Sequence, residues 1–370
     1  MPKSVLIIGA GVIGLTLASE LGKAGIETTV YESNASVSQN AARASGIFSR
    51  EGLSKMGIRY KKAMLNTLNG AIVHGGGQAL EVQTPDTKAY VLDRGILAGI
   101  CAEEARANGA EIALNKRLTK DELVELSKDE SKIIVGADGA VSSVASAFGF
   151  PQIKEYVLTY KAEYENATIN DMHKVELFFS NNVSNRFFGW TVPYSPTRLE
   201  VGVGASSYSK KTSSSAFGAF VKTKEVEAML GGAKKAAGYA SIIPIQSRKK
   251  TVIGNVLLVG DAAGQVKATT GGGIIFGAAC ARLASKAILE NIDSEKPLGR
   301  YERMWRRNYG LDLKLHRALH HYYSGLGDRS LAAAIMMSKL FGFERFLSMY
   351  GDMDSPSLML KRFFLRKISN

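Results

Sequence analysis

The stretch Ser4–Ser33, SVLIIGAGVIGLTLASELGKAGIETTVYES, decides the fold of this chain. Its first part, residues 5–8, is a continuous apolar run that is typical of a buried parallel strand. A glycine-rich turn follows, and apolar residues then recur near helical spacing over 12–21. Residues 28–31 predict a second strand, which ends at Glu32. The stretch therefore reads as a strand, a turn, a helix and a strand with an acid at its tip.

The glycines of the turn are spaced as Gly9-x-Gly11-x-x-Gly14, and each has a mechanical role. Gly9 permits the tight turn, Gly11 lets the backbone approach a pyrophosphate, and Gly14 lets the helix lie close to the strand. Phosphates would rest on the N-terminus of the helix, where free N–H groups and the helix dipole favour anions. Glu32 is placed to accept hydrogen bonds from an adenosine ribose, and its charge disfavours NADP in this site. The unit predicts dinucleotide binding and leaves the choice between FAD and NAD open.

Length and composition favour an α/β protein with one large domain or two interleaved domains. The chain has 370 residues, of which 45% are apolar and 38 are glycine. Its N-terminus does not resemble a signal peptide, and its apolar runs are shorter than a membrane-spanning helix requires. The two cysteines, Cys101 and Cys280, lie far apart in helical patterns, which favours a reducing compartment. We therefore expect a cytoplasmic protein.

The formal net charge is +13, which suits an anionic partner. No zinc-ligand spacing or RNA-recognition strand accompanies this charge, so nucleic acid is not expected. Basic residues gather towards the C-terminus, and a short basic piece over 358–368 reads as amphipathic. Peripheral contact with an anionic membrane at its inner face and a merely solvated surface both remain open. These basic residues are Arg300, Arg303, Arg306, Arg307, Lys361, Arg362, Arg366 and Lys367.

Further strands of the first sheet are predicted at 132–135 and 255–259. The first ends in the turn Gly136–Gly139, and the second ends in Gly260-Asp261. An acid at the carboxyl end of such a strand lies where an open α/β sheet binds its ligand. A long helix is then expected from Thr269 through 288.

Between these strands, residues 34–49 form an irregular segment and 70–82 and 90–92 read as short strands. Asp93 is a candidate N-cap for a helix, and Arg94 in its first turn could bind an anion or a cofactor carbonyl. The helix has an apolar stripe that should be buried. The stripe consists of Ile96, Leu97, Ile100 and Ala105.

Between 151 and 251 the character changes to aromatic and β-branched runs, which predict an antiparallel sheet. These runs are 175–179, 186–192 and 198–203, and an exposed loop over 206–215 leads to a helix over 216–230. Residues 115–131 are charged and helix-prone, and helices are expected over 300–325 and 330–350.

Three histidines lie close together as His316, His320 and His321. The first two are four residues apart on one helical face, which could ligate a metal. Because no acid joins them at a convincing spacing, we expect a surface or capping role and no metal site.

Three motifs together resemble the FAD-binding signature of the para-hydroxybenzoate hydroxylase-like flavoproteins. They are the first glycine pattern with its acid, Gly136-Ala137-Asp138-Gly139, and Leu258-Val259-Gly260-Asp261-Ala262-Ala263. Within that group, the run GDAAGQVKATTGGGIIFGA, preceded by FGWTVPYSPTRLEVGVG, is most similar to the geranylgeranyl reductase family. That family saturates isoprenoid double bonds of archaeal lipids or quinones. The likeness extends over about the first 300 residues.

The resemblance implies an α/β fold with a Rossmann-like FAD-binding domain of the para-hydroxybenzoate hydroxylase type. An inserted antiparallel β-sheet substrate domain and a helical C-terminus would complete it. The FAD-binding domain would comprise 1–70, 88–150 and 252–299, the substrate domain 71–87 and 151–251, and the helical region 300–370.

The resemblance also implies site residues. Gly9, Gly11, Gly14 and Glu32 would hold the ADP half of FAD. Arg94 would hold its middle, Asp261 with Gly260 its ribityl chain, and Asp138 with Gly139 would mark the second turn. Gly271, Gly272 and Gly273 would pass close to the flavin ring, where a side chain would collide with it. Phe188, Trp190 and Pro193 match the lining of the lipid pocket, although Val192 stands where an aromatic residue is usual.

Two positions depart from the family pattern. Ser45-Gly46 replaces the Cys-Gly pair that often lies beside the flavin, and Ala268 replaces a proline before the triple glycine. Ser45 is therefore expected to lie beside the flavin. The sequence identifies no residue as the proton donor.

The implied reaction is FAD-dependent reduction of C=C bonds in a geranylgeranyl lipid or a quinone side chain, with NAD(P)H or another reductant as electron donor. A flavin-dependent monooxygenase and a flavoprotein electron carrier to a membrane quinone are the alternatives.

Overall fold

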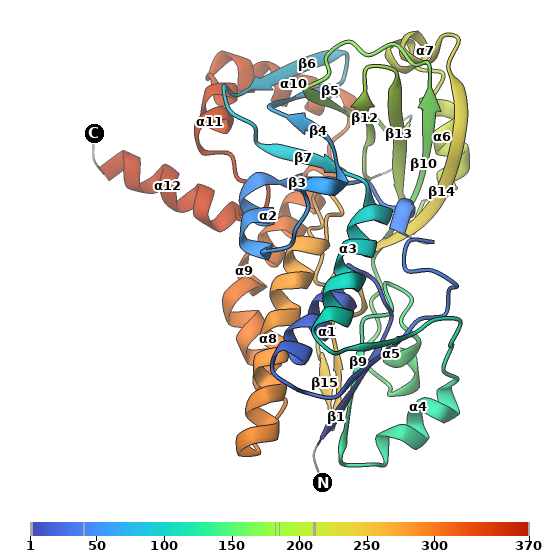
Figure 1. The fold of residues 1–370 in the computed structure, drawn as a ribbon. Coiled ribbons are helices and arrows are strands. Elements are labelled where there is room, and N and C mark those ends of the chain that lie inside the picture. Colours follow the sequence, from blue (N-terminus) through green and yellow to red (C-terminus); the bar gives the residue numbers. More distant parts are fainter. Residues whose placement is uncertain (1–2, 40, 182, 185, 210–211, 369–370) are drawn as a thin grey trace.

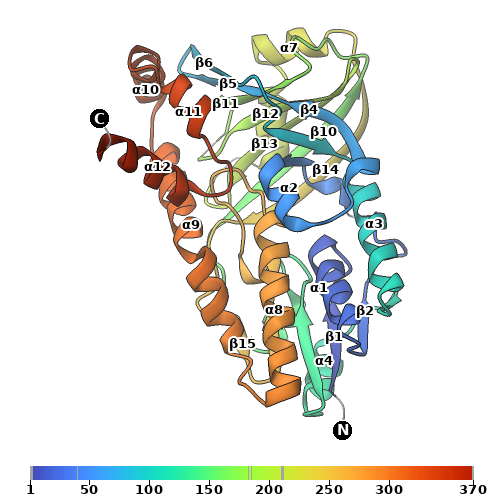
Figure 2. The same ribbon diagram turned by 60° about the vertical axis from the view of Figure 1, so that its left-hand side comes forward.

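A computed structural model describes residues 3–39, 41–181, 183–184, 186–209 and 212–368. Its strands form a six-stranded, a seven-stranded and a three-stranded sheet. The first of these occupies the lower half of the molecule in Figure 1, and the other two occupy the upper half. The long helices α8 (Ile274–Ser294) and α9 (Arg300–Ser324) run side by side along the lower half (Figure 2).

The six-stranded sheet is built around β1 (Ser4–Ile8) and is mostly parallel. Residues of its strands are buried on both faces, which explains their continuous apolar sequences. One face packs against α1 (Val12–Lys23), α3 (Arg94–Ala107) and α8. The other packs against α4 (Lys120–Ser127) and α5 (Ser143–Ala147). In sheet order the strands are β15 (Val252–Ile253), β16 (Val256–Leu258), β9 (Lys132–Gly136), β1, β2 (Thr28–Tyr31) and β8 (Glu111–Ala113).

The seven-stranded sheet is antiparallel except for one pair. All described pairs within the inserted run 151–251 are antiparallel, which confirms the prediction. The one parallel pair joins β11 to β5, a strand from the segment before α3. In sheet order the strands are β14 (Lys234–Pro244), β10 (Tyr156–Glu165), β13 (Arg198–Ser206), β12 (Gly189–Ser195), β11 (Lys174–Phe179), β5 (Gly70–Gly75) and β6 (Gln78–Gln83).

The outer face of this sheet is covered by α6 (Ser213–Phe220) and α7 (Lys224–Leu230). The single helix expected over 216–230 is therefore wrong, because Thr223 begins a new helix as its N-cap. Of the loop expected over 206–215, residues 210–211 lie outside the described part of the chain. The inner face meets the three-stranded sheet of β3 (Ile47–Ser49), β7 (Ala89–Leu92) and β4 (Met64–Leu68).

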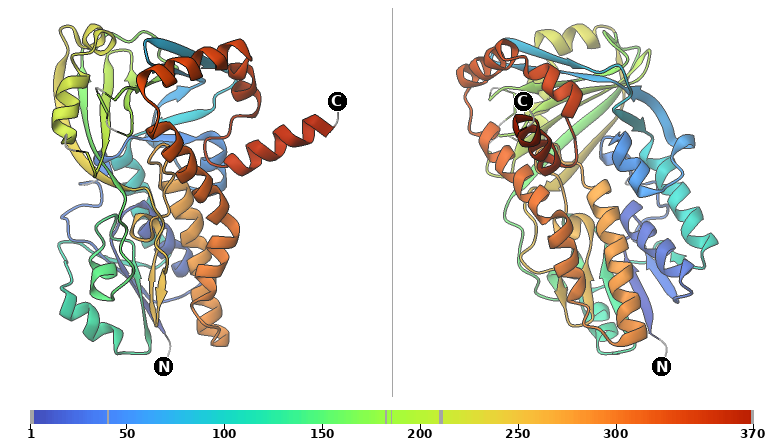
Figure 3. Two further views of the ribbon diagram at one scale, coloured as in Figure 1. Left: turned by 180° about the vertical axis from the view of Figure 1, so that it is seen from behind. Right: turned by 90° about the vertical axis from the view of Figure 1, so that its left-hand side faces the viewer.

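The C-terminal helices connect the two halves. After α9, helices α10 (Asp328–Leu340) and α11 (Phe343–Tyr350) pack on β6. The last helix, α12 (Pro356–Ile368), contacts α9 and α11 and then projects away from the body (Figure 3). In the described part of the chain, no helix is both long and apolar enough to cross a membrane.

Three sequence-based details need correction. Ile96 was expected in the buried stripe of α3 but is 47% exposed, whereas Leu97 and Ala105 are buried. The helix expected from Thr269 starts five residues later, at Ile274, because the triple glycine remains a turn. Within 115–131 only α4 is helical.

Candidate functional site

A cavity of about 350 Å³ lies between the two larger sheets. The residues that follow the carboxyl ends of β1, β9 and β16 form one side of it, which is where open α/β sheets bind ligands. The other side is formed by residues of β10, β11, β12 and β14 and by the two phenylalanines that precede β12. The lining includes Gly11, Arg94, Gly139, Asp261, Gly271, Gly272 and Gly273 on the first side and Val175, Leu177, Phe188, Trp190 and Val192 on the second.

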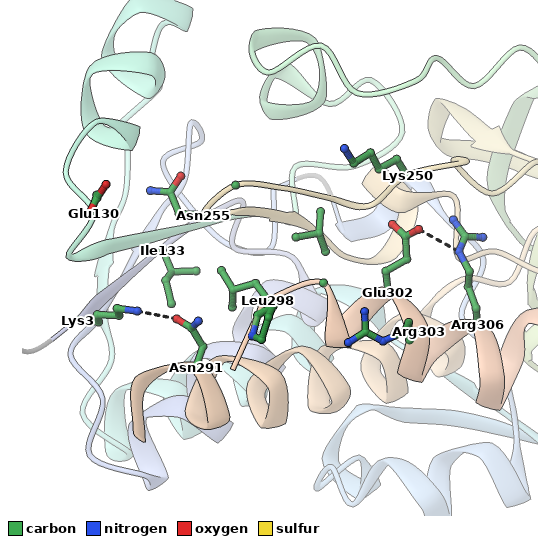
Figure 4. Close-up of a pocket in the computed structure, with 14 residues that line it drawn as sticks. Lys3, Glu130, Ile133, Lys250, Asn255, Asn291, Leu298, Glu302, Arg303 and Arg306 are labelled. Atoms are coloured by element: carbon green, nitrogen blue, oxygen red, sulfur yellow. Dashed lines mark hydrogen bonds and ion pairs between the residues drawn. The ribbon is translucent and has the colours of Figure 1, made fainter. Parts of the chain in front are cut away.

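A second hollow, of about 600 Å³, lies at the opposite edge of the six-stranded sheet. It is lined by polar side chains around Lys3, whose Nζ donates to Asn291 Oδ1, and by the ion pair between Glu302 and Arg306 (Figure 4). It contains none of the residues that the motifs single out. The smaller cavity is therefore the candidate site.

The first glycine turn has the geometry that its sequence predicts. Gly9 has a φ of +107°, which favours glycine, and a Cβ at Gly14 would lie 2.1 Å from the carbonyl oxygen of Gly9. A Cβ at Gly11 would meet no described atom within 4 Å, so this position faces open space in the cavity. Glu32 closes the turn, since its Oε2 accepts a hydrogen bond of 2.9 Å from the N–H of Ala10. The turn leaves the N-terminus of α1 free for an anion.

Arg94 and Asp261 both line the cavity, and each influences the pKa of the other. Burial lowers the pKa of Arg94, and it raises the pKa of Asp261 although the arginine opposes that shift. The buried Nε of Arg94 has no hydrogen-bond partner among the described residues. An unsatisfied buried donor is costly, so it fits a ligand with an acceptor at this place. FAD has such acceptors along its pyrophosphate and its ring, and the donor set of the cavity fits this cofactor.

The triple glycine forms the turn before α8 and lines the cavity. Protein atoms already crowd the positions of the missing side chains. A Cβ at Gly273 would lie 2.7 Å from Oδ1 of Asp261, and a Cβ at Gly272 would lie 2.8 Å from Cε of Lys267. Those two contacts are with the ends of side chains that can move aside, whereas Gly271 has a φ of +75°, which favours glycine in itself. Gly260 is required as well, because its φ is +64° and its Cβ would meet Ile13.

Some predicted site residues lie outside the cavity lining. The carboxylate of Asp138 accepts hydrogen bonds from Ser143 Oγ and Val144 N–H and thereby caps α5. Gly46 is needed for strand pairing, because a Cβ there would lie 1.9 Å from the carbonyl oxygen of Leu92. The carbonyl of Pro193 accepts a hydrogen bond from Asn66. These three residues therefore contribute to the site indirectly, by stabilising the elements that carry its lining.

Ser45 lines the cavity and donates a hydrogen bond to Glu200, a residue that the motif search missed. Glu200 also accepts hydrogen bonds from Trp190 Nε1 at 2.8 Å and from Tyr194, and its Oε2 lies 2.6 Å from Nζ of Lys161. Burial alone would raise the pKa of Glu200, but the ammonium of Lys161 and these donors hold it below the ordinary value. The carboxylate thus remains charged and fixes two residues of the cavity wall. An acid within the apolar run of β13 is the one sequence signal that points to it.

The model of the FAD-binding domain family matches residues 3–303, which is more than half of the chain. The chain belongs to this FAD-binding family. A digeranylgeranylglycerophospholipid reductase of Methanocaldococcus jannaschii is 28% identical to this FAD-binding protein, over 89% of this chain and 88% of the relative. Digeranylgeranylglycerophospholipid reductase 2 of Methanothermobacter thermautotrophicus is 26% identical, over 90% and 91%.

Among solved structures, a geranylgeranyl bacteriochlorophyll reductase-like protein of Thermoplasma acidophilum superposes with a TM-score of 0.79. It is 17% identical, and the match covers 97% of this chain and 95% of that one. This likeness confirms the predicted fold of the FAD-binding protein. The family match and the relatives above confirm FAD as the cofactor, the resemblance to geranylgeranyl reductases and the class of FAD-dependent oxidoreductases.

The surface role predicted for His316 and His320 of the FAD-binding protein is wrong, because both are buried, at 4% and 2% exposure. His316 accepts from the hydroxyl of Thr269 and contacts the carbonyl of Asp354, and His320 pairs with the hydroxyl of Tyr323. In the described residues, no group of three or more His, Cys, Asp or Glu side chains could hold a metal. Cys101 and Cys280 are buried free thiols.

Proposed function

We propose that this protein uses FAD to reduce carbon–carbon double bonds of an isoprenoid lipid, of the geranylgeranyl type on which its relatives are named to act. The observation that carries the proposal is that one cavity has two chemically different sides. Glycine turns, Arg94 and Asp261 form a polar side, and a wall of Val175, Leu177, Phe188 and other apolar residues faces it. The apolar isoprenoid chain and the flavin would then lie next to each other in the same cavity.

The bound flavin would supply hydride transfer, and the residues of the chain would bind and orient it. We assign the ADP half to Gly9, Gly11, Gly14 and Glu32, since the turn and the N-terminus of α1 suit a pyrophosphate. We assign the middle of the cofactor to Arg94, whose Nε has no partner among the described residues, and the ribityl chain to Asp261.

The remaining turns would support the flavin ring. We propose that the flavin ring lies close to Gly271, Gly272 and Gly273, which line the cavity at the start of α8. Gly139 lines it as well. In contrast, Gly46, Asp138 and Gly260 would act indirectly by shaping the turns that hold the lining residues.

The substrate wall is assigned to Phe188 and Trp190, which both line the cavity, with Pro193 supporting them from behind. Trp190 cannot rotate freely, because its indole N–H is bound to a buried carboxylate. Ser45 lies beside this wall, and its hydroxyl donates a hydrogen bond to the same carboxylate, that of Glu200. We therefore assign the proton donor to no side chain.

The test is to mix the dithionite-reduced protein with a geranylgeranyl lipid under anaerobic conditions. Reoxidation of the flavin by the lipid would support the proposal. A monooxygenase would instead consume O2 together with NADPH, and an electron carrier would be reoxidised by short-chain quinones alone. The same stopped-flow measurement with each oxidant separates the three cases. For turnover, we propose NAD(P)H or a similar small reductant as the electron donor, which steady-state assays with each candidate would test.

We further propose that the protein works at the inner face of an anionic membrane. The end of α10 and the start of α11 support this idea, because Leu340 and Phe341 are 76% and 74% exposed there. Lys339 and Arg345 lie on the same two helices, and Lys361 and Arg362 are exposed on α12. Apolar side chains flanked by basic ones suit an anionic lipid surface. Side chains beyond Arg362 lie outside the described part of this helix.

Sedimentation with phosphatidylglycerol vesicles would test membrane contact. Binding should weaken when salt is raised, when 358–370 is deleted, or when Leu340 and Phe341 are both changed to Ser. Equal binding by all variants would contradict it.

We also propose the functional division of the chain that the resemblance implies, with FAD on 1–70, 88–150 and 252–299. The substrate would lie on 71–87 and 151–251. The membership of β5 and β6 in the seven-stranded sheet supports this assignment.

A further inference from the structure

The ion pair between Lys267 and Asp354 connects the glycine turn of the cavity to the C-terminal region. Nζ of Lys267 lies 2.6 Å from Oδ1 of Asp354 and 3.2 Å from the carbonyl oxygen of Met353. Both charged side chains are largely buried, with 6% and 12% exposure. Burying two charges is costly, and the same volume could hold apolar side chains. A pair in this place therefore calls for a functional explanation.

Lys267 lies directly against the triple glycine. Its backbone N–H donates to the carbonyl of Gly272 at 3.2 Å, and its carbonyl accepts from the N–H of Gly271 at 2.8 Å. A Cβ at Gly272 would lie 3.3 Å from the ammonium nitrogen. Lys267 itself lines the cavity. A fixed positive charge is thus added where the N-terminus of α8 already presents the positive end of a helix dipole.

The partner acid is held by the C-terminal region. Oδ2 of Asp354 accepts a hydrogen bond from Ser49, and its carbonyl contacts Nε2 of His316 at 3.2 Å. Three residues further on, the N–H of Ser357 donates to Asp312 at 2.9 Å. Burial by itself would raise the pKa of Asp354, but the ammonium of Lys267 holds it below its usual range. The acid is therefore ionised and stationary, and it neutralises part of the charge of Lys267.

We propose that Lys267 favours the reduced form of FAD in this site and that Asp354 limits this preference by competing for the same ammonium. The inference rests on the proposed function, in that FAD must occupy the cavity. Two-electron reduction adds negative charge to the flavin ring near neutral pH, and a nearby cation in a water-poor cavity stabilises that charge. Lys267 is thus a residue that tunes the cofactor, and Asp354 acts through it.

The coupling must be reciprocal. If Asp354 weakens the attraction between Lys267 and reduced FAD, then reduction of FAD weakens the ion pair by the same factor. The pair anchors the segment 352–357, and this segment contributes Met353 to the cavity lining. Reduction is therefore expected to loosen this part of the wall, next to the space assigned to the lipid.

The first test is the midpoint potential of the FAD-loaded protein. Asp354→Asn should shift it to a more positive value, Lys267→Met to a more negative value, and Lys267→Arg should remain near wild type. A tenfold change in the relative affinity for reduced FAD corresponds to about 30 mV for this two-electron couple. Asp171→Asn is the matched control, because Asp171 forms an ion pair of the same 2.6 Å length with Lys174 outside the cavity lining.

Potentials of the Asp354 and Lys267 variants that equal the control would overturn the inference while leaving FAD binding and lipid reduction untouched. Absence of FAD binding by wild-type protein would overturn both.

The second test uses wild-type protein and does not depend on the folding of a variant. Amide hydrogen exchange over 352–357 should be faster in the reduced holoprotein than in the oxidised one. In Asp354→Asn the two states should exchange alike. Equal protection of this segment in both oxidation states of the wild type would contradict the coupling.

Discussion

Lys161 and Glu200 form an ion pair of 2.6 Å whose side chains are only 3% and 0% exposed. The carboxylate at its centre holds Ser45 and Trp190, and both of these residues line the cavity. A charged group at the back of an apolar wall thus fixes the shape of that wall.

Removing the charge of Glu200 should destabilise the protein strongly. Glu200→Gln would leave the buried ammonium of Lys161 with only the more distant Glu163, at 3.7 Å, as a counter-charge, so the free energy of unfolding should fall by up to about 3–5 kcal/mol. Urea denaturation monitored by circular dichroism would measure this loss. Glu125→Gln is the control, because the ion pair of Glu125 with Lys128 has the same length but is exposed. Its loss should cost about 0.5 kcal/mol or less, and equal losses in the two variants would contradict the role of the buried pair.

Arg94→Met should affect cofactor binding more than it affects the fold. The Nε of Arg94 has no partner in the described part of the protein, so little hydrogen bonding is lost from the apoprotein. Its loss should nevertheless weaken FAD binding by about 1.5–3 kcal/mol, or roughly ten- to a hundredfold, which is typical of hydrogen bonds that involve a charged group. Fluorescence titration with FAD and thermal melting of the apoprotein would separate the two effects. An unchanged Kd for FAD would remove Arg94 from the site.

Filling the apolar side of the cavity should block the lipid and spare the cofactor. Leu177→Trp adds volume to the wall on β11, so lipid-dependent reoxidation should slow at least about tenfold while the Kd for FAD stays the same. Leu158→Trp on β10 is the control, because Leu158 is 37% exposed and lies outside the cavity lining. If both variants reduce the lipid at the wild-type rate, the substrate lies elsewhere.

Acid should destabilise the fold through His316 and His320. Burial lowers the pKa of each of them to about 4, so the folded protein keeps them neutral at a pH where the unfolded chain binds protons. Their stabilising contribution is present above pH 6.5 and is lost as the pH falls towards 4. The loss for each histidine should be on the order of 1–3 kcal/mol.

Chemical denaturation between pH 7 and pH 4 would measure this dependence. His320→Phe should flatten it relative to wild type, whereas His173→Phe should not, because His173 is exposed and does not contribute to the pKa shift of His316 or His320. A slope that is the same in wild type and His320→Phe would show that this histidine is not responsible.

The fold around the glycine turn could be predicted from sequence because its determinants are local. The strand, glycine turn and helix of Ser4–Ser33 are each specified by residues adjacent in the chain, and the structure reproduces their limits closely. The same holds for Asp93, which caps α3 as expected.

The polar network behind the cavity could not be predicted in the same way, because its partners are distant in sequence. Lys161 and Glu200 are 39 residues apart, and Lys267 and Asp354 are 87 apart. A charged residue in a strand or loop is usually exposed, so only the folded arrangement shows that each of these two pairs is buried. The burial of His316 could not be predicted for the same reason, because the C-terminal segment that contacts it at Asp354 carries no recognisable motif.

The mass of the lipid after a single anaerobic turnover tests the central claim most directly. Reduced, FAD-loaded protein mixed with an excess of a geranylgeranyl lipid should yield lipid that has gained two hydrogens, in an amount equal to the flavin that is reoxidised. Flavin that is reoxidised only by O2 or by a quinone, with the mass of the lipid unchanged, would contradict the account.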